Sequence, residues 1–424
     1  MSRPAIPGPQ DITRVELPNG IVVLARANPF SPSVTISGGL MAGALNNPPD
    51  KLGLADFTAS ALMRGTQLRD MQAIYDTLES AGASLGFSAG THTTGFHGKC
   101  LAEDLSMLLG LLAETLTQPA FPAAPVEKLR NQILTGLALR DDDTGDRAGM
   151  LFDELAYPDH PYSLPEEGQP WTVKAITRTD LAVFHAAHYG PRGLLLAVVG
   201  GVDPQVAAEA VAAALGNWTN PSQPEPPALP ALGPHSAERR GRVPMPGKSQ
   251  TDILLGAPGP ARNDPQYVAA ALANDVLGGF GMMGRIGESV REKAGLAYYA
   301  GSNLGGSLGP GPWSVSAGVH PKDEEQAIDL IKQEIRRLVT EPVSAEELAD
   351  SQEAAIGRLP LSLETNGGVT GALLNMERHN LGLDYYQRYP EMMRAVTRED
   401  SLAAARQFLN PDALAIALAG PLEA

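Results

Sequence analysis

The feature that most constrains the fold of this chain is a proline-rich segment near its middle. Six prolines fall within residues 217–242, at Pro221, Pro224, Pro226, Pro227, Pro230 and Pro234. Each proline removes a backbone donor and fixes its own φ, so this stretch favours an extended linker over a helix or strand. The sequence therefore predicts an N-terminal domain at 1–216, a linker at 217–242 and a C-terminal domain at 243–424.

Similar patterns recur in the same order on both sides of this linker. An amphipathic helical pattern at 102–116 and a second helix at 124–139 have counterparts at 323–338 and 345–358, and each pair is separated by a short proline-containing turn. Further along, an apolar strand pattern follows a helix at 194–199 and again at 414–418. Such self-similarity predicts two duplicated α/β units.

Alternating apolar residues predict strands at 15–25 and 34–39 in the first half and at 250–255 in the second. Strand and helix patterns are mixed and do not alternate strictly, which favours antiparallel-rich sheets. We therefore predict an α+β protein with two similar tandem α/β domains.

Composition restricts the partners. The formal net charge is −16, and an acidic surface is repelled by nucleic acid and by anionic membranes. Cys100 is the single cysteine, so no intramolecular disulfide forms, and the first ten residues lack an apolar signal region. We expect a cytoplasmic protein, or a periplasmic one if a leader has been removed, with no nucleic acid or membrane partner.

Residues 50–66 read Asp-Lys-Leu-Gly-Leu-Ala-Asp-Phe-Thr-Ala-Ser-Ala-Leu-Met-Arg-Gly-Thr. This stretch resembles the zinc-binding helix of the pitrilysin/insulinase-type metallopeptidases, where His-x-x-Glu-His precedes an apolar run and a Gly-Thr pair. Asp56 stands at the first His position, Ala59 at the Glu position and Ser60 at the second His position. The family's remaining zinc ligand is a Glu on a later helix, and Gly136 or a neighbour matches it. Zinc prefers imidazole, thiolate or carboxylate ligands, so the resemblance implies a chain without its own metal site.

The C-terminal half keeps a second family segment, Arg285-Ile-Gly-Glu-Ser-Val-Arg-Glu-Lys-Ala-Gly-Leu-Ala-Tyr. In the family, an arginine and a tyrosine of this segment reach a partner's active site and bind substrate carbonyls and the developing oxyanion. The resemblance assigns these roles to Arg291 and Tyr298. The alternative from residue type alone is a surface helix arginine and a half-buried strand tyrosine.

A glycine-rich stretch precedes that segment. Gly279, Gly281 and Gly284 match a dinucleotide fingerprint by letter, but a helical pattern precedes them where that fingerprint needs a strand. The resemblance implies that Gly278, Gly279 and Gly281 contact substrate, as a longer glycine-rich loop does in the mitochondrial processing peptidase. A tight turn between helices is the alternative.

Two other candidates are weaker. His185 and His188 share a helix face without a third metal ligand. Cys100 is more typical of a small buried residue than of a reactive thiol.

The resemblance implies a non-catalytic subunit of a heterodimeric zinc endopeptidase, inactive alone and similar to the alpha subunit of the mitochondrial processing peptidase. Its two domains would form half of a clamshell, and a homologous subunit would carry the zinc. We expect the substrate to be a peptide, held by strand addition to a sheet edge. The alternative is a catalytically inert pseudo-peptidase that serves as a peptide-binding or assembly module.

Overall fold

The computed structural model describes residues 6–233 and 235–422. Of the ten N-terminal residues that lack an apolar signal region, the first five lie outside this range. The chain folds into two compact units that each combine segments of both sequence halves. Unit 1 comprises residues up to Leu137, Pro165–Ala228 and Leu359–Gln387. Unit 2 comprises Ala138–Leu164, Leu229–Arg358 and the residues from Arg388 onward. The division falls inside three helices, α4 (Ala123–Asp142), α11 (Ala345–Ser362) and α13 (Tyr385–Ala395).

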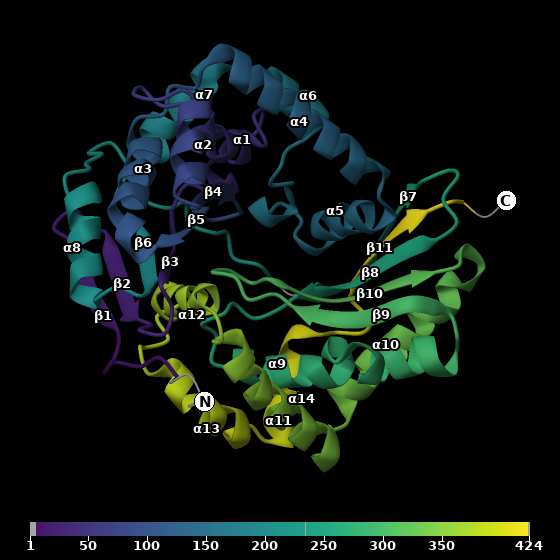
Figure 1. Ribbon diagram of the computed structural model, residues 1–424. Coiled ribbons are helices and arrows are strands. Elements are labelled where there is room, and N and C mark those ends of the chain that lie inside the picture. Colours follow the sequence, from purple (N-terminus) through teal and green to yellow (C-terminus); the bar gives the residue numbers. More distant parts are fainter. Residues whose placement is uncertain (1–5, 234, 423–424) are drawn as a thin grey trace. The chain divides into compact units, whose positions relative to one another are not determined.

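Unit 1 is built on a sheet with strand order β1-β2-β6-β3-β5-β4 (Figure 1). Its strands are β1 (Thr13–Glu16), β2 (Val22–Ala27), β3 (Ser33–Leu40), β4 (Ser84–Ala89), β5 (Thr94–Leu101) and β6 (Leu195–Gly200). Only β2 and β6 pair in parallel, and every other pairing in this sheet is antiparallel. Strand β4 pairs with β5 alone, so it forms one edge.

The helices of unit 1 cover both faces of this sheet. They are α1 (Leu54–Ala61), α2 (Met71–Ser80), α3 (Leu105–Thr117), α6 (Pro170–Ala175), α7 (Arg178–His188), α8 (Pro204–Leu215) and α12 (Asn366–Arg378). Helices α3 and α8 contact β5 and β2, whereas α12 contacts β6 and β3. The apolar core contains Ile36, Leu108 and Val198, all fully buried. Because helices cover β6 on both sides, its sequence is an unbroken apolar run without alternation.

Unit 2 has a sheet with strand order β7-β11-β8-β10-β9 (Figure 1). Its strands are β7 (Arg239–Pro244), β8 (Thr251–Pro258), β9 (Ala297–Leu304), β10 (Pro312–Val319) and β11 (Ala415–Gly420). Again one pair, β7 and β11, is parallel and the others are antiparallel. Strand β9 forms one edge, as β4 does in the first sheet.

Helices also lie on both faces of the second sheet. They include α5 (Thr144–Ala156), α9 (Tyr267–Asn274), α10 (Glu324–Thr340) and α14 (Arg398–Phe408), with π-helices η5 (Asp275–Gly279) and η7 (Gly287–Lys293). Figure 1 shows α5 on one side of this sheet and α9, α10 and α14 on the other. Phe152 and Ala156 of α5 pack on Ala415 and Ala417 of β11, all buried.

The five strands of the second sheet correspond in order to β2, β6, β3, β5 and β4 of the first sheet, in which β1 is additional. Each sheet receives a helix from the other half of the sequence. Helix α5 follows α4 in the first half but packs on β11, β8 and β7 of unit 2. Helix α12 follows α11 in the second half but packs on β6 and β3 of unit 1. This reciprocal exchange supports the predicted duplication. The predicted α+β class with two similar antiparallel-rich sheets is confirmed.

Most predicted elements are present, with two clear differences. Residues 239–242, predicted to belong to the extended linker, form the first part of β7, where they pair in parallel with β11. The strand predicted at 15–25 is two antiparallel strands, because Gly20 adopts a φ of +90° in the turn between β1 and β2. Matching caps begin α7 and α14: Thr177 with Asp180, and Thr397 with Asp400, form reciprocal capping boxes.

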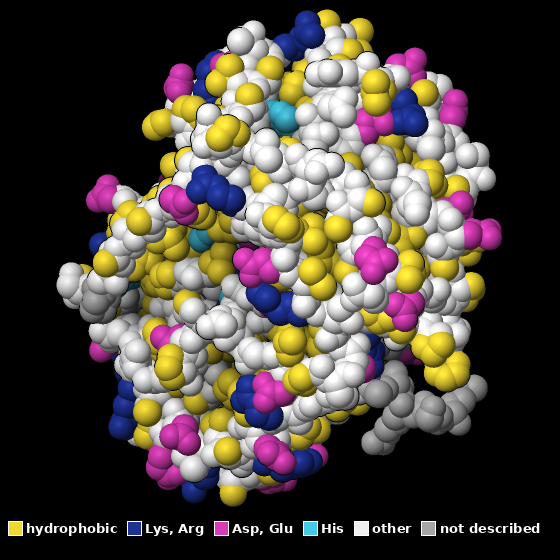
Figure 2. Space-filling model, turned by 90° about the vertical axis from the view of Figure 1, so that its left-hand side faces the viewer, with side chains coloured by type: hydrophobic (Ala, Val, Ile, Leu, Met, Phe, Trp, Pro, Cys, Tyr) yellow, Lys and Arg dark blue, Asp and Glu magenta, His cyan; other side chains and the backbone are white. Residues whose placement is uncertain are grey.

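The molecular surface mixes both signs of charge. Figure 2 shows acidic and basic side chains scattered between hydrophobic ones over one face of the molecule. Within residues 6–233 and 235–422, no helix combines the length and apolar character needed to cross a bilayer.

Candidate functional site

The helix that resembles a zinc-binding helix is intact, but its side chains cannot bind zinc. Helix α1 begins after Gly53, whose φ of +89° is left-handed, and it places Asp56, Ala59 and Ser60 on successive turns. Ala59 is fully buried and has no donor atom. Gly136 on α4 is exposed, with open space where a side chain would begin. Within the described residues no group of three His, Cys, Asp or Glu side chains is arranged to hold a metal.

Asp56 lies in an acidic environment. Burial, followed by the nearby Glu167 and Glu166 carboxylates, raises the pKa of Asp56 to about 6, and a hydrogen bond from the Ala89 backbone opposes the rise. A zinc ligand in this family position would be a neutral imidazole. Asp56 instead places a carboxyl that is half-protonated near pH 6 beside two others, and burial, together with repulsion from those carboxylates, disfavours its charged form.

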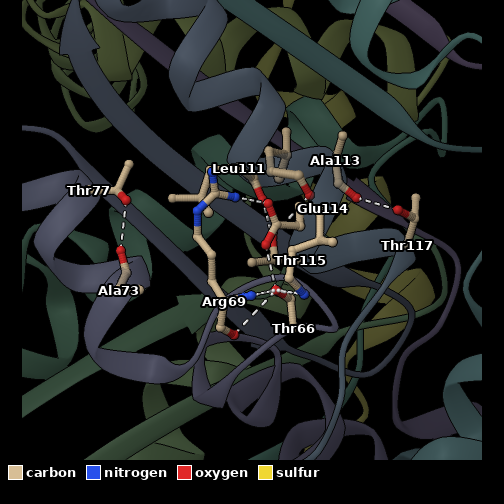
Figure 3. Close-up of polar contacts among 11 residues, drawn as sticks. Thr66, Arg69, Ala73, Thr77, Leu111, Ala113, Glu114, Thr115 and Thr117 are labelled. Carbon is tan, nitrogen blue, oxygen red and sulfur yellow. Dashed lines mark hydrogen bonds and ion pairs between the residues drawn. The ribbon is translucent and has the colours of Figure 1, made fainter.

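The Gly-Thr pair after α1 is held by a buried carboxylate (Figure 3). Glu114 of α3 is 7% exposed, accepts a hydrogen bond from Thr66 and forms an ion pair with Arg69. The Arg69 backbone N–H donates to the Thr66 hydroxyl over 2.9 Å, and Gly65 adopts a φ of +141°. This network fixes the turn that follows α1. The frame of the motif therefore persists for packing reasons while its metal positions are replaced.

In unit 2, Arg291 and Tyr298 lie together. The Arg291 guanidinium carbon is 5.9 Å from the centre of the Tyr298 ring, within the range of a cation–π contact. Tyr298 is 82% exposed, and the Arg291 side chain is 36% exposed. Arg291 ends 3.8 Å from Glu292, a weak surface contact that leaves its fork accessible. Both groups can therefore present donors to a ligand from outside the unit.

The backbone between them explains this proximity. Helix η7 ends at Lys293, and Gly295 follows with a φ of +66°, as is typical after a helix C-terminus. Two backbone hydrogen bonds close the turn, from Gly295 to the Arg291 carbonyl and from Leu296 to the Val290 carbonyl, each 3.0 Å long. Val290 is fully buried and anchors the helix in the core.

A β-bulge places Tyr298 on the edge strand. Tyr299 pairs with Gly318 of β10 and Ala297 pairs with the next residue, Val319, so Tyr298 has no partner in the register. The extra residue breaks the alternation of β9, and both tyrosines point away from the core. Without the bulge, adjacent side chains would project to opposite faces of the sheet.

Tyr299, the residue after Tyr298, stabilises the bulge. Its hydroxyl donates to Asp252 Oδ1 over 2.5 Å, and burial, followed by this hydrogen bond to a buried carboxylate, raises the pKa of Tyr299. Asp252 also accepts from Gln250 over 2.8 Å and from Thr144. A Cβ on Gly318 would approach the Tyr299 ring to 2.6 Å, so only glycine allows this ring to lie flat on the strand.

A partly buried ion pair fixes the beginning of the same segment. Arg285 is 6% exposed and holds Glu347 of α11 through two hydrogen bonds of 2.7 and 2.8 Å. The hydrogen bond from Arg285 is the largest cause that lowers the pKa of Glu347 to about 2. Glu347 and Ser344 also form a reciprocal cap at the start of α11. The Arg291 helix is thus tied to α11 through its first residues.

The three glycines predicted to contact substrate have different surroundings. A Cβ on Gly278 would lie 2.7 Å from the Ser302 backbone nitrogen, so Gly278 allows the helix end to approach β9 closely. A Cβ on Gly279 would meet Asp275 at 2.6 Å. Gly281 has a φ of +61° and open space above it. The space available to a side chain is therefore restricted at Gly278 and Gly279, whereas half-buried Gly281 has open space above it and is followed by Met283, which is 88% exposed.

The comparisons with known proteins fit this architecture. Residues 22–163 match the family model described as insulinase (peptidase family M16), and residues 175–355 match the model described as peptidase M16 inactive domain. Together the two segments cover more than half of the chain. The protein belongs to the M16 peptidase family.

Relatives agree along nearly the whole M16 chain. An uncharacterized zinc protease of Streptomyces coelicolor is 27% identical over 97% of this chain and 90% of its own length. A crystal structure titled peptidase M16 inactive domain, from Pseudomonas fluorescens, is 26% identical with a TM-score of 0.87, covering 98% of both chains. A Helicobacter pylori protease has the same fold, with a TM-score of 0.88 at 19% identity over 98% of this chain and 100% of its own.

Zinc is named in the description of the Streptomyces relative, but the residues of this M16 chain do not fit it. Ala59 offers no ligand or base, Ser60 is a poor ligand and Gly136 has no side chain. No catalytic step in this chain can therefore be assigned to a metal held by these positions.

The other sequence candidates of this M16 chain have structural explanations. His185 Nε2 lies 2.8 Å from the Leu116 carbonyl, and burial lowers the pKa of both His185 and His188. Cys100 is buried, and burial raises its pKa to about 11, so its thiol stays protonated and unreactive at neutral pH.

Sequence reasoning missed the residues that support Tyr298. Asp252 lies on a strand pattern that gave no sign of a buried carboxylate, and its partner Tyr299 is 47 residues away. The ion pair between Arg285 and Glu347, 62 residues apart, was also not recognisable from the sequence. The one available signal was the adjacency of two tyrosines, which cannot both face outward on a regular strand.

Proposed function

We propose that this chain is the non-catalytic, Arg/Tyr-bearing subunit of a heterodimeric zinc endopeptidase. A homologous M16 subunit would supply the zinc, its ligands and the Glu base. This chain would contribute Arg291 and Tyr298 to the shared reaction and bind an extended peptide. Alone, it would be inactive.

The contrast between the two segments carries the proposal. Every metal position on α1 and α4 is replaced, at Asp56, Ala59, Ser60 and Gly136. The Arg291–Tyr298 pair, in contrast, is exposed, in mutual contact and supported by a bulge, a capped helix and the Arg285–Glu347 ion pair. A chain that serves only as a scaffold has no physical need to hold an exposed tyrosine in this manner.

The chemistry of the pair suits amide hydrolysis. The partner's zinc would activate water and polarise the scissile carbonyl. Arg291 offers a planar fork of donors that remains charged at all working pH values, suited to peptide carbonyls. The Tyr298 hydroxyl offers one further donor to the oxyanion that forms as the carbonyl becomes tetrahedral. A preorganised donor of this kind contributes about 10²–10³ in kcat.

Reconstitution with the zinc-bearing homologue tests the proposal. We expect Tyr298→Phe to lower the kcat of the mixed enzyme by about 10²-fold, with little change in the affinity of the two subunits. The matched control is Tyr75→Phe on α2 of unit 1, a partly buried tyrosine whose hydroxyl makes no hydrogen bond among the described residues. This control should retain full turnover.

If Tyr298→Phe and Tyr75→Phe give equal turnover, the catalytic role is wrong. An enzyme that is equally active without this chain would favour the alternative, an inert M16 protein used for peptide binding or assembly. The loss of the metal positions on α1 is the observation that favours this alternative.

The glycine-rich turn belongs to the same proposal. Gly281, with its open surroundings, is the residue of the turn best placed to let a peptide backbone approach. Gly278 and Gly279 would act through the shape of the turn.

A further inference from the structure

Arg378, the last residue of α12, is a half-buried cation in unit 1 that lacks a counterion. Among the residues that the structure describes, no hydrogen bond, ion pair or aromatic contact involves its guanidinium. The neighbouring carboxylate, Glu377, is held by Arg14 over 2.8 Å. Burial lowers the pKa of Arg378, and no acidic group opposes this effect.

The guanidinium lies over bare backbone. A Cβ on Gly39 of β3 would lie 3.2 Å from Arg378 Nη2 and 3.5 Å from Gly95 Cα. Gly39 pairs with Gly95 of β5, and Gly95 pairs with Ser88 of β4. Two glycines in register therefore form a floor without side chains beside the guanidinium, and the Ser88 hydroxyl lies 4.0 Å from where a Cβ of Gly95 would be.

The rest of this sheet face is polar and open. Along β5, His97 and Lys99 alternate with buried residues and lie on the same exposed face as Gly95. Along β4, Ser84, Gly86 and Ser88 are exposed. Helix α12 packs mainly on β6 and β3, and it contacts β4 and β5 much less. The face thus combines three basic side chains with small ones in a chain whose net charge is −16.

A half-buried arginine without a partner costs stability, because its desolvation is not offset by an opposite charge. Such a group is retained for packing only if its stem fills essential space. Here the nitrogen atoms meet a glycine floor and leave the space above Gly95 unfilled. A planar, bidentate ligand matches the fork and restores the missing charge.

We propose that Arg378 and the Gly39–Gly95 floor bind a carboxylate of a peptide that lies across this face of the unit 1 sheet. The carboxylate comes either from an acidic side chain or from the C-terminus of the peptide. The site requires that peptides are the ligands, as in the proposed function, but it needs neither Arg291, Tyr298 nor a partner subunit.

Fluorescence anisotropy with the isolated full chain separates the two carboxylate sources. The first probe pair is an N-terminally labelled neutral peptide with a free or an amidated C-terminus. In the second pair both peptides have an amidated C-terminus, and one carries a central Glu where the other carries Gln. We expect one of the two pairs to show tighter binding of the carboxylate member by about 10- to 100-fold, the range for a hydrogen bond to a charged group.

Arg378→Met should abolish that preference while keeping the length of the side chain. The charge control is Arg192→Ala, which removes an exposed cation of unit 1 that pairs with Glu225, and it should retain the preference. Because an unpaired half-buried charge is replaced by an apolar chain, Arg378→Met should unfold at the same or a higher temperature than the wild type. A merely structural arginine would lower that temperature when replaced.

The proposal is wrong if neither pair shows a preference, if no probe binds, or if Arg378→Met keeps the preference. These outcomes are independent of the catalytic role, because no turnover is measured. Conversely, if Tyr298→Phe does not change turnover in the mixed enzyme, the catalytic role is overturned and the anisotropy result is unaffected.

Discussion

Asp56 shows how a single replaced ligand changes the physics of a metal position. An imidazole there would be neutral and ready to bind zinc, whereas the Asp56 carboxyl meets Glu166 and Glu167 and is partly desolvated. Its pKa rises to about 6, so the folded chain holds this proton more tightly than the unfolded chain does. The position has become a source of instability at neutral pH.

This cost predicts a pH-dependent effect of Asp56→Asn. The folded pKa lies above the unfolded value of about 3.9, so stability from this group is fully present below pH 4 and is lost as pH rises through 6. Asn cannot ionise and can still accept the Ala89 hydrogen bond. We expect the variant to match the wild type near pH 4 and to exceed it by about 2 kcal/mol at pH 7.

Urea unfolding at pH 4, 5, 6 and 7 measures this difference. If the difference in unfolding free energy between Asp56→Asn and the wild type does not change with pH, the account of Asp56 is contradicted.

At the scale of the element, the bulge in β9 is the device that presents Tyr298. It depends on Gly318, because a Cβ there would meet the Tyr299 ring at 2.6 Å and Gln250 at 2.4 Å. Gly318→Ala should therefore displace Tyr299, weaken its hydrogen bond to Asp252 and cost about 1–3 kcal/mol, as overpacking does. Turnover of the mixed enzyme should fall although Tyr298 itself is unchanged.

Thermal unfolding and the kcat of the mixed enzyme check this prediction together. The matched control is Gly136→Ala, where a Cβ meets nothing and helix propensity improves by up to about 1 kcal/mol. If Gly318→Ala unfolds like the wild type and keeps full turnover, the bulge does not position Tyr298.

Local elements were largely predictable from the sequence, and their tertiary details were not. The helix α10 has strong apolar periodicity, and Thr177 and Thr397 mark the starts of α7 and α14. The bulge could not be predicted, because it depends on the register of β9 against β10. The break at Gly20 was missed because the apolar pattern continues through the turn.

The site was predictable only in part, for a similar reason. The resemblance identified Arg291 and Tyr298, which the structure brings together, and the replaced positions Asp56, Ala59, Ser60 and Gly136. Arg378 gave no signal, because its lack of a counterion depends on a helix that packs on β3, more than 300 residues earlier in the chain.

At the scale of the whole molecule, each sheet is completed by a helix from the other sequence half. The boundary predicted at the proline-rich segment separates the halves of the sequence, but α5 and α12 lie on the sheet of the opposite half. Residues 1–216 alone would expose the strands that α12 covers, and residues 217–424 alone would lack Phe152 and Ala156 of α5.

We therefore expect neither fragment to unfold cooperatively when it is expressed alone, whereas co-expression should restore the fold. Circular dichroism melting of each fragment and of the co-purified pair measures this. Two fragments that each melt cooperatively and remain monomeric would show that the exchanged helices are dispensable.

The central claim is that a chain without zinc ligands completes the active site of another subunit, and a turnover titration tests it most directly. Adding this chain to a fixed amount of its zinc-bearing homologue should raise peptide hydrolysis to a plateau at one-to-one stoichiometry. With Tyr298→Phe the plateau should appear at the same stoichiometry but about 10²-fold lower. A homologue that is fully active alone, or equal plateaus for the wild type and Tyr298→Phe, would contradict the account.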